Sequence, residues 1–110
     1  MDSSSPSTGI KRIESEIRLV WRQFDVSRLP AKQKAVLAEL EQDLLDARKY
    51  TSAYELSETR EEQLNNAKTA KHWLNKARRC ILTASEHDIF SAVDVASLSA
   101  QIETVKEKLG

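Results

Sequence analysis

The residue types most capable of chemistry are concentrated in one segment of the chain, KTAKHWLNKARRC, residues 68–80. Its thirteen positions hold five Lys or Arg residues, one of the two histidines and the only cysteine. Three interpretations compete for such a segment: a surface that binds phosphates, a metal or nucleophilic site, or the solvated face of a helix. The spacing of these residues distinguishes between the three interpretations.

A reactive site is disfavoured by distance. His72 and Cys80 lie eight residues apart, which is about 12 Å along a helix, too far to share a metal or to activate one another. Cys80 shares a helix face with Trp73, so we expect it to act as a small core hydrophobe. His87 lies between two carboxylates in the sequence EHD, but no second histidine has helical spacing to it. We therefore predict no catalytic residue, no metal ligand and no cofactor.

The glycine pattern excludes two further kinds of enzyme site. The only glycines are Gly9 and Gly110, so the chain has neither a glycine-rich phosphate loop nor a nucleophile elbow. A helical-bundle enzyme built from scattered residues stays open as a less favoured alternative, with no residues to assign to it.

A nucleic-acid surface is the second interpretation. The candidate basic face consists of Lys68, Lys71, His72, Lys76, Arg78 and Arg79. Residues 63–85 hold five basic groups and no acidic one, whereas residues 35–62 hold three basic and eight acidic groups. If the two segments form a hairpin that turns near residue 57, acidic and basic groups face each other, in the pairs Asp46–Lys68, Asp43–Lys71 and Glu39–Lys76. Trp73 lies on the apolar face, so no aromatic ring is interleaved for base stacking.

A family resemblance bears on the same alternative. The helix-turn-helix region of bacterial sigma factors resembles two stretches, LPAKQKAVLAEL (29–40) and TREEQLNNAKTAKHWLNKARR (59–79). The glycine-containing turn of that motif is absent, so no family is assigned. A small nucleic-acid-associated regulator that uses the basic face therefore remains the alternative function.

The whole chain is electrically balanced, with 17 basic and 17 acidic side chains. It has no overall field that would draw it to nucleic acid or to an anionic membrane. No apolar run approaches the roughly 20 residues of a membrane span. The N-terminus lacks the pattern of a secretory signal, and the single cysteine cannot form a disulfide within the chain, so we expect a cytoplasmic location.

Helices must position all of these residues. Between Ile10 and Leu109 the chain has no glycine and one proline, Pro30, and apolar residues recur at intervals of three and four. The four apolar stripes are Ile10, Ile13, Ile17, Val20 and Phe24; Leu37, Leu40, Leu44, Ala47, Thr51 and Tyr54; Leu64, Ala67, Ala70, Trp73, Leu74, Ala77, Cys80, Ile81 and Ala84; and Val95, Leu98, Ile102, Val105 and Leu109. The pattern predicts an all-α fold, an antiparallel up-down-up-down four-helix bundle with a long central hairpin and shorter flanking helices.

The predicted helices have recognisable boundaries. Residues 1–9 are rich in serine and are expected to form a disordered tail before a single domain of residues 10–110. The second helix starts at Pro30 and reaches about residue 55, or breaks near Thr51. The third starts at a capping box formed by Thr59 and Glu62, and the fourth at Ser91 with Asp94.

The unequal helix lengths suggest where a partner binds. The second and third helices are each predicted to be about 39 Å long, far longer than their neighbours, so the hairpin tip projects or the second helix breaks. Leucines off the main stripes and tyrosines near the tip form the candidate interface: Leu19, Leu45, Tyr50, Tyr54 and Leu56. The expected function is a non-enzymatic protein-interaction or self-association module, whose partner is another protein or a second copy in a homo-oligomer.

Overall fold

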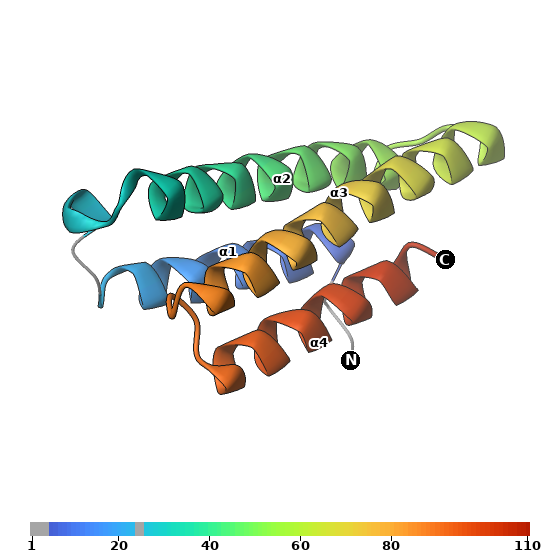
Figure 1. Ribbon diagram of the computed structural model, residues 1–110. Helices are drawn as coiled ribbons and strands as arrows, with labels where there is room; N and C mark the ends of the chain where they lie inside the picture. The colour runs from blue at the N-terminus through green and yellow to red at the C-terminus, as the bar shows by residue number, and fades with distance from the viewer. Residues whose placement is uncertain (1–4, 24–25) are drawn as a thin grey trace.

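The computed structural model describes residues 5–23 and 26–110. These residues form α1 (Pro6–Trp21), a short 3-10 helix η1 (Val26–Arg28), α2 (Ala31–Glu55), α3 (Arg60–Glu86) and α4 (Ala92–Lys108). Successive helices run in opposite directions, and α1 and α4 form a layer beside the α2–α3 hairpin (Figure 1). The structure thus confirms the all-α bundle with its long central hairpin. Among the described residues, none of the helices combines the length and the apolar character that crossing a bilayer requires.

The start of α1 lies earlier than the sequence pattern predicts. Ser5 is the N-cap, and its Oγ accepts a hydrogen bond from the backbone N–H of Thr8 at 3.2 Å. Pro6 follows at the first helical position, where its missing N–H costs nothing. Residues 6–9, expected in a disordered tail, are therefore helical, while residues 1–4 and Phe24 of the first stripe lie outside the described residues.

Helix α2 is continuous from Ala31 to Glu55, so the alternative of a break near Thr51 is excluded. Thr51 is fully buried, and its hydroxyl has no hydrogen-bond partner among the described residues. Pro30 occupies the N-cap position directly before the helix. The long hairpin is therefore formed by two unbroken helices, α2 and α3.

The other predicted boundaries hold. Thr59 Oγ1 accepts from the backbone N–H of Glu62 at 3.1 Å. The second half of the predicted capping box does not form, because Glu62 Oε2 accepts from the backbone N–H of Glu58 at 3.4 Å instead of from that of Thr59. At α4 the capping box is complete, because Ser91 Oγ accepts from Asp94 N–H and Asp94 Oδ2 accepts from Ser91 N–H, each at 3.1 Å. These contacts satisfy backbone donors that the first helical turn leaves free.

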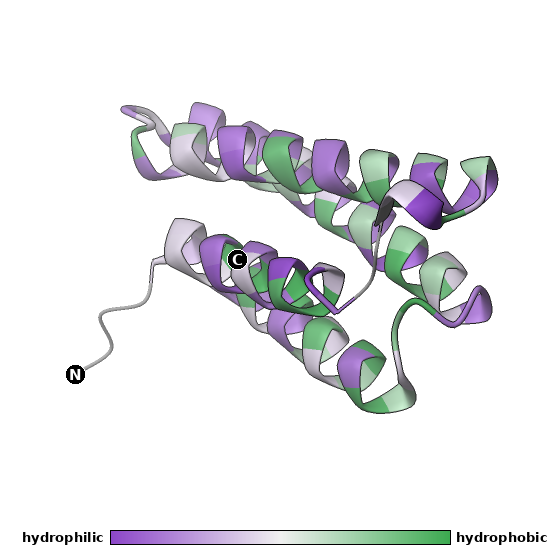
Figure 2. Ribbon diagram, turned by 90° about the vertical axis from the view of Figure 1, so that its left-hand side faces the viewer, coloured by the Kyte–Doolittle hydropathy of each residue, from purple (hydrophilic) through white to green (hydrophobic). Residues whose placement is uncertain are grey.

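The core is built from the apolar stripes of all four helices. Hydrophobic and hydrophilic residues alternate around each helix, as expected where one side is buried (Figure 2). The largest fully buried side chains are Ile10, Ile13, Leu40, Leu74, Ile81, Leu98, Ile102, Val105 and Thr51. Small residues line much of the buried side of α3, including Ala67, Ala70, Ala77 and Ala84, and they allow α2 and α3 to approach closely along their length.

Candidate functional site

The five candidate interface residues do not form one surface. Leu45 is 47% exposed and borders α1, whereas Leu19 is 58% exposed and lies beside Gln101 of α4. Leu56, 81% exposed, lies directly after α2. Tyr50 and Tyr54 are half-buried against the core, and the Tyr54 hydroxyl donates to the backbone carbonyl of Lys108 at 3.5 Å. Sequence periodicity identified residues off the main stripe but not the side that each one faces.

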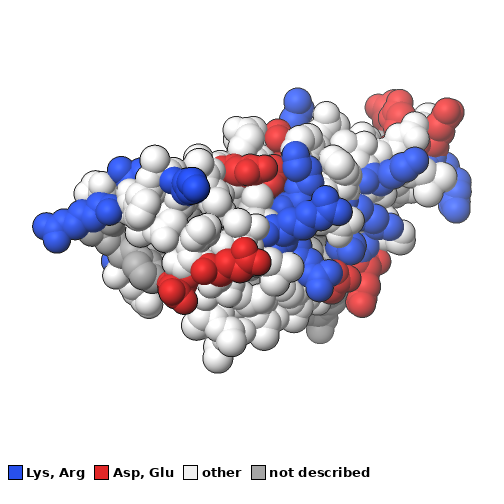
Figure 3. Space-filling model, viewed as in Figure 1, with Lys and Arg blue, Asp and Glu red and all other residues white. Residues whose placement is uncertain are grey.

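The candidate basic face is divided by the structure. Lys and Arg side chains gather over α3, with acidic side chains on either side (Figure 3). Arg78 forms an ion pair with Glu103 at 3.5 Å, and the ammonium group of Lys76 lies 4.8 Å from the centre of the Trp73 ring. Arg79 borders a hollow next to Cys80. Lys68, Lys71 and His72 line a separate groove nearer the start of α3.

The three predicted charge pairs between α2 and α3 are absent, because no Asp or Glu carboxylate oxygen lies within 4.0 Å of the amines of Lys68, Lys71 or Lys76 among the described residues. The residue opposite Asp43 is Cys80, nine positions beyond the predicted Lys71. The reason lies in the connection. The segment after Glu55 runs beside the first turns of α3, where Asn66 Nδ2 donates to Ser57 Oγ at 3.1 Å. Helix α3 therefore begins beyond the end of α2, and Lys68 and Lys71 shift away from their predicted partners, whereas Lys76 still lines a hollow with Glu39.

A buried polar cluster is the consequence of that register. Asp43 is 2% exposed and Cys80 is 7% exposed, and the thiol of Cys80 donates to Asp43 Oδ2 at 3.3 Å. Burial, together with the hydrogen bond to Asp43 and the negative charge of Asp43, raises the pKa of Cys80 to about 12. Burial likewise raises the pKa of Asp43, although the Cys80 hydrogen bond and the positive charge of Lys76 oppose the change. The thiol is protonated at neutral pH and is a poor nucleophile.

The same cluster contains the donor atoms that a divalent metal ion uses. Ligand atoms of Glu39, Asp43 and Cys80 all lie within 4.8 Å of one another. Sequence reasoning missed this grouping, because its members come from two helices. The one signal that could have found it is the position of Asp43, which has the spacing of a core residue between Leu40 and Ala47.

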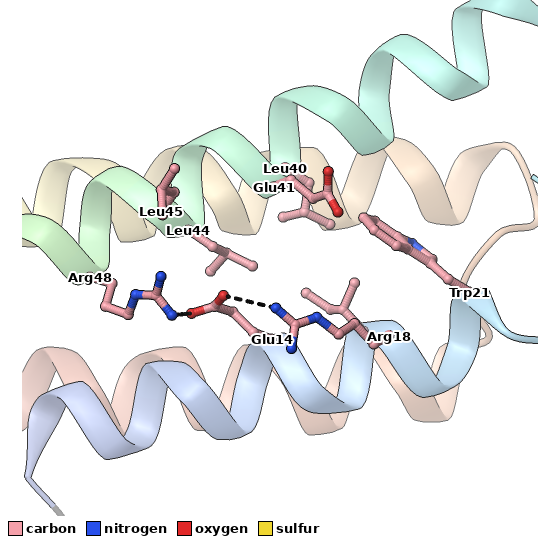
Figure 4. A pocket seen from close by; sticks show the side chains of 9 residues that line it. Glu14, Arg18, Trp21, Leu40, Glu41, Leu44, Leu45 and Arg48 are labelled. Atoms are coloured by element: carbon pink, nitrogen blue, oxygen red, sulfur yellow. Dashed lines mark hydrogen bonds and ion pairs between the residues drawn. The ribbon is translucent and has the colours of Figure 1, made fainter.

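A hollow with a volume of about 220 Å³ lies between α1 and α2. Its floor is formed by the buried side chains of Ile17, Leu40 and Leu44. Leu45 forms part of the wall, and the indole of Trp21 lies across one end (Figure 4). The indole Nε1 is buried and has no hydrogen-bond partner among the described residues. We call this hollow the α1–α2 groove.

Charged side chains surround the α1–α2 groove. Glu14 pairs with Arg48 at 3.3 Å and with Arg18 at 3.8 Å, as the dashed lines in Figure 4 show. Glu41 adds a second carboxylate at the edge. The groove therefore combines an apolar floor, an unused N–H donor and a rim with two groups of each sign, features that are typical of recognition surfaces.

The chain matches no protein-family model, no curated protein and no solved structure. The function proposed below therefore rests on the geometry of the chain itself.

Proposed function

We propose that this protein is a self-associating helical module, in which the α1–α2 groove of one copy packs against the same groove of a second copy. The observation that supports this most is the groove itself, an open hollow between two helices whose floor is made of core residues. It offers a hollow of about 220 Å³ and, in Leu45, a half-exposed leucine of suitable size to enter the hollow of a partner.

Symmetry favours a second copy over an unrelated partner. A two-fold interface brings the same patch together with itself, so the patch must be complementary to itself. The rim meets this requirement, because Glu14 and Glu41 can face Arg18 and Arg48 of the other copy. The net charge of zero also removes overall repulsion between copies.

The size of the hollow limits the strength of the association. Because the hollow is small, we expect a weak dimer that forms at micromolar or higher concentrations, as is typical of small interfaces.

Sedimentation equilibrium over a wide range of protein concentrations tests this proposal. The wild-type chain should change from monomer to dimer as concentration rises, and Leu45→Glu should weaken the dimer at least tenfold, or about 1.4 kcal/mol, by placing a charge in an apolar contact. Leu19→Glu and Leu56→Glu are matched controls, because both leucines are exposed but lie outside the groove. Neither should change the dimer.

A second readout follows the groove directly. In a Trp73→Phe background Trp21 is the only tryptophan, so its fluorescence emission should change with concentration over the same range as the sedimentation data. A wild-type chain that is monomeric throughout would refute self-association. Equal weakening by the two control variants would refute the groove as its site.

A further inference from the structure

A second groove lies on another side of the molecule, between the first half of α3 and the end of α4. Its volume is about 560 Å³, within the range of small-molecule and cofactor sites. Arg60, Lys68, Lys71 and His72 line it along α3, and Tyr54 and Leu109 border it from the neighbouring helices. We call it the α3–α4 groove.

The electrostatic character of the α3–α4 groove is unusual for a chain with no net charge. No Asp or Glu side chain is among its lining residues. No Asp or Glu carboxylate lies within 4.0 Å of the side-chain nitrogens of Arg60, Lys68 or Lys71 among the described residues, in contrast to Arg78 and Lys106, which both pair with Glu103. The Lys71 ammonium instead donates to the backbone carbonyl of Gly110.

The register of the hairpin explains this concentration of charge. Cys80 takes the position opposite Asp43 that Lys71 was predicted to occupy. The first half of α3 is thereby displaced from the predicted acidic partners on α2, and Arg60, Lys68 and Lys71 are left without an Asp or Glu partner among the described residues. The positive charge of the groove results from this shift. In the predicted hairpin register, acidic residues of α2 would have neutralised that charge.

The spacing of the cations decides between kinds of anion. Arg60, Lys68 and Lys71 lie at positions i, i+8 and i+11 of α3 and all line the groove. They extend over about 16 Å of helix, much longer than one phosphate group. A row of phosphates along a strand fits this spacing better than a single phosphate does.

Apolar surface accompanies the charges. Leu64 is 58% exposed, and the half-buried Tyr54 also lines the groove. Unstacked bases contact aromatic and apolar side chains in proteins that bind single strands, and the backbone follows a positively charged groove. Paired bases in a duplex are not available for such contacts.

We propose that the α3–α4 groove binds a short segment of single-stranded nucleic acid, with Arg60, Lys68 and Lys71 each contacting a phosphate of the same strand. Contacts of this kind hold the backbone and carry little sequence information. Binding is therefore independent of sequence and strongly dependent on salt.

Fluorescence anisotropy of a labelled, mixed-sequence single strand tests the proposal, with salt varied between about 50 and 200 mM. Three phosphate contacts predict a slope of about −2 for the logarithm of the affinity against the logarithm of salt concentration. Lys68→Ala with Lys71→Ala should reduce the steepness by about 1.4, since each single-strand phosphate contact contributes about 0.7.

Two matched double variants separate this groove from general charge effects. Lys32→Ala with Lys34→Ala removes the same charge from exposed lysines at the start of α2, and Arg78→Ala with Arg79→Ala removes it from the other part of the basic face. Both should retain the wild-type slope. No strand binding at the lowest salt, or equal losses in all three double variants, would overturn the proposal.

Two competitors define the ligand. Duplex of the same sequence should compete poorly with the labelled strand. Inorganic pyrophosphate at an equal phosphate concentration should also compete poorly. Full displacement of the labelled strand by pyrophosphate would overturn the proposal and indicate that the groove binds a small anion. Leu45→Glu should bind the strand as the wild type does, because Leu45 does not line this groove, so failure here and failure of self-association are distinguishable.

Discussion

Cys80 and Asp43 show how two titratable residues can change each other's chemistry inside a helical core. The thiol of Cys80 has little contact with solvent and donates to a carboxylate that is itself buried. Each group is held in an environment that disfavours its charged form. The sequence suggests that Cys80 is an ordinary small hydrophobe. In the structure Cys80 is also a hydrogen-bond donor.

The reactivity of Cys80 should therefore be low. Its pKa is raised from 9.0 to about 12, so at about pH 8 the thiolate fraction falls about a thousandfold. The higher nucleophilicity of a more basic thiolate recovers about 20-fold of this loss. We expect reaction with a thiol-specific disulfide reagent to be at least about 50-fold slower in the native protein than in denaturant, measured by the absorbance of the released product. Equal rates in the two conditions would contradict the buried hydrogen bond.

Asp43 should affect stability in a pH-dependent manner. Burial raises its pKa above the ordinary 3.8, so the folded state holds the proton more tightly than the unfolded state. The stabilisation that results is fully present below about pH 3.8 and is lost as the pH rises through the folded pKa. At neutral pH the buried carboxylate is therefore a cost, which Asp43→Asn removes.

The expected result is a higher urea midpoint for Asp43→Asn than for the wild type at pH 7. The difference should shrink as the pH is lowered, because protonated aspartic acid and asparagine are both neutral. Asp46→Asn, on the same helix but more exposed, is the control and should show no gain at pH 7. A lower midpoint for Asp43→Asn at pH 7 would show that the carboxylate is compensated by its surroundings.

Among the helices, α1 and α4 make the most constrained contact. A Cβ atom added to Gly9 of α1 would lie 2.6 Å from Cγ2 of Val105, closer than carbon atoms can approach. Val105 is buried and β-branched, so it cannot easily move away. Gly9 therefore sets the distance between the two helices.

Gly9→Ala should consequently destabilise the fold by about 1–3 kcal/mol, although the same change within a helix normally gains about 0.5–1 kcal/mol. In a Val105→Ala background the clash is absent, and Gly9→Ala should be neutral or stabilising. Chemical denaturation of the four chains in a double-mutant cycle measures the coupling. Additive effects of the two substitutions would rule out the close contact.

Helix interiors were predictable from sequence, whereas their relative placement was not. Periodicity located the core residues, and the Ser91 and Thr59 caps marked two helix starts. The start of α1 was missed because Ser5–Pro6 resembles tail composition as much as a cap with proline at the first position. The register of α2 against α3 depends on the path of four connecting residues and on the Ser57–Asn66 contact, which no periodicity encodes.

On the scale of the whole molecule, the two grooves are formed by different helix pairs. The α1–α2 groove is apolar with a mixed rim, and the α3–α4 groove is basic. The sequence suggested both an apolar interface and a basic face, but it assigned Leu19, Tyr54 and Arg78 to surfaces that the fold separates. A dimer formed through the first groove would carry two copies of the second. Binding of one strand by both copies would then be intramolecular after the first contact, which raises the apparent affinity.

The pairing of α1 with α4 also affects the growing chain on the ribosome. Helix α1 is synthesised first and α4 last, and the roughly 70 residues between Trp21 and Ala92 take about 4 to 14 s to translate. During that interval the α2–α3 hairpin can form from neighbouring segments, while the side of α1 that contacts α4 stays uncovered. The nascent chain is thus most open to chaperone capture and to aggregation just before its final helix is released.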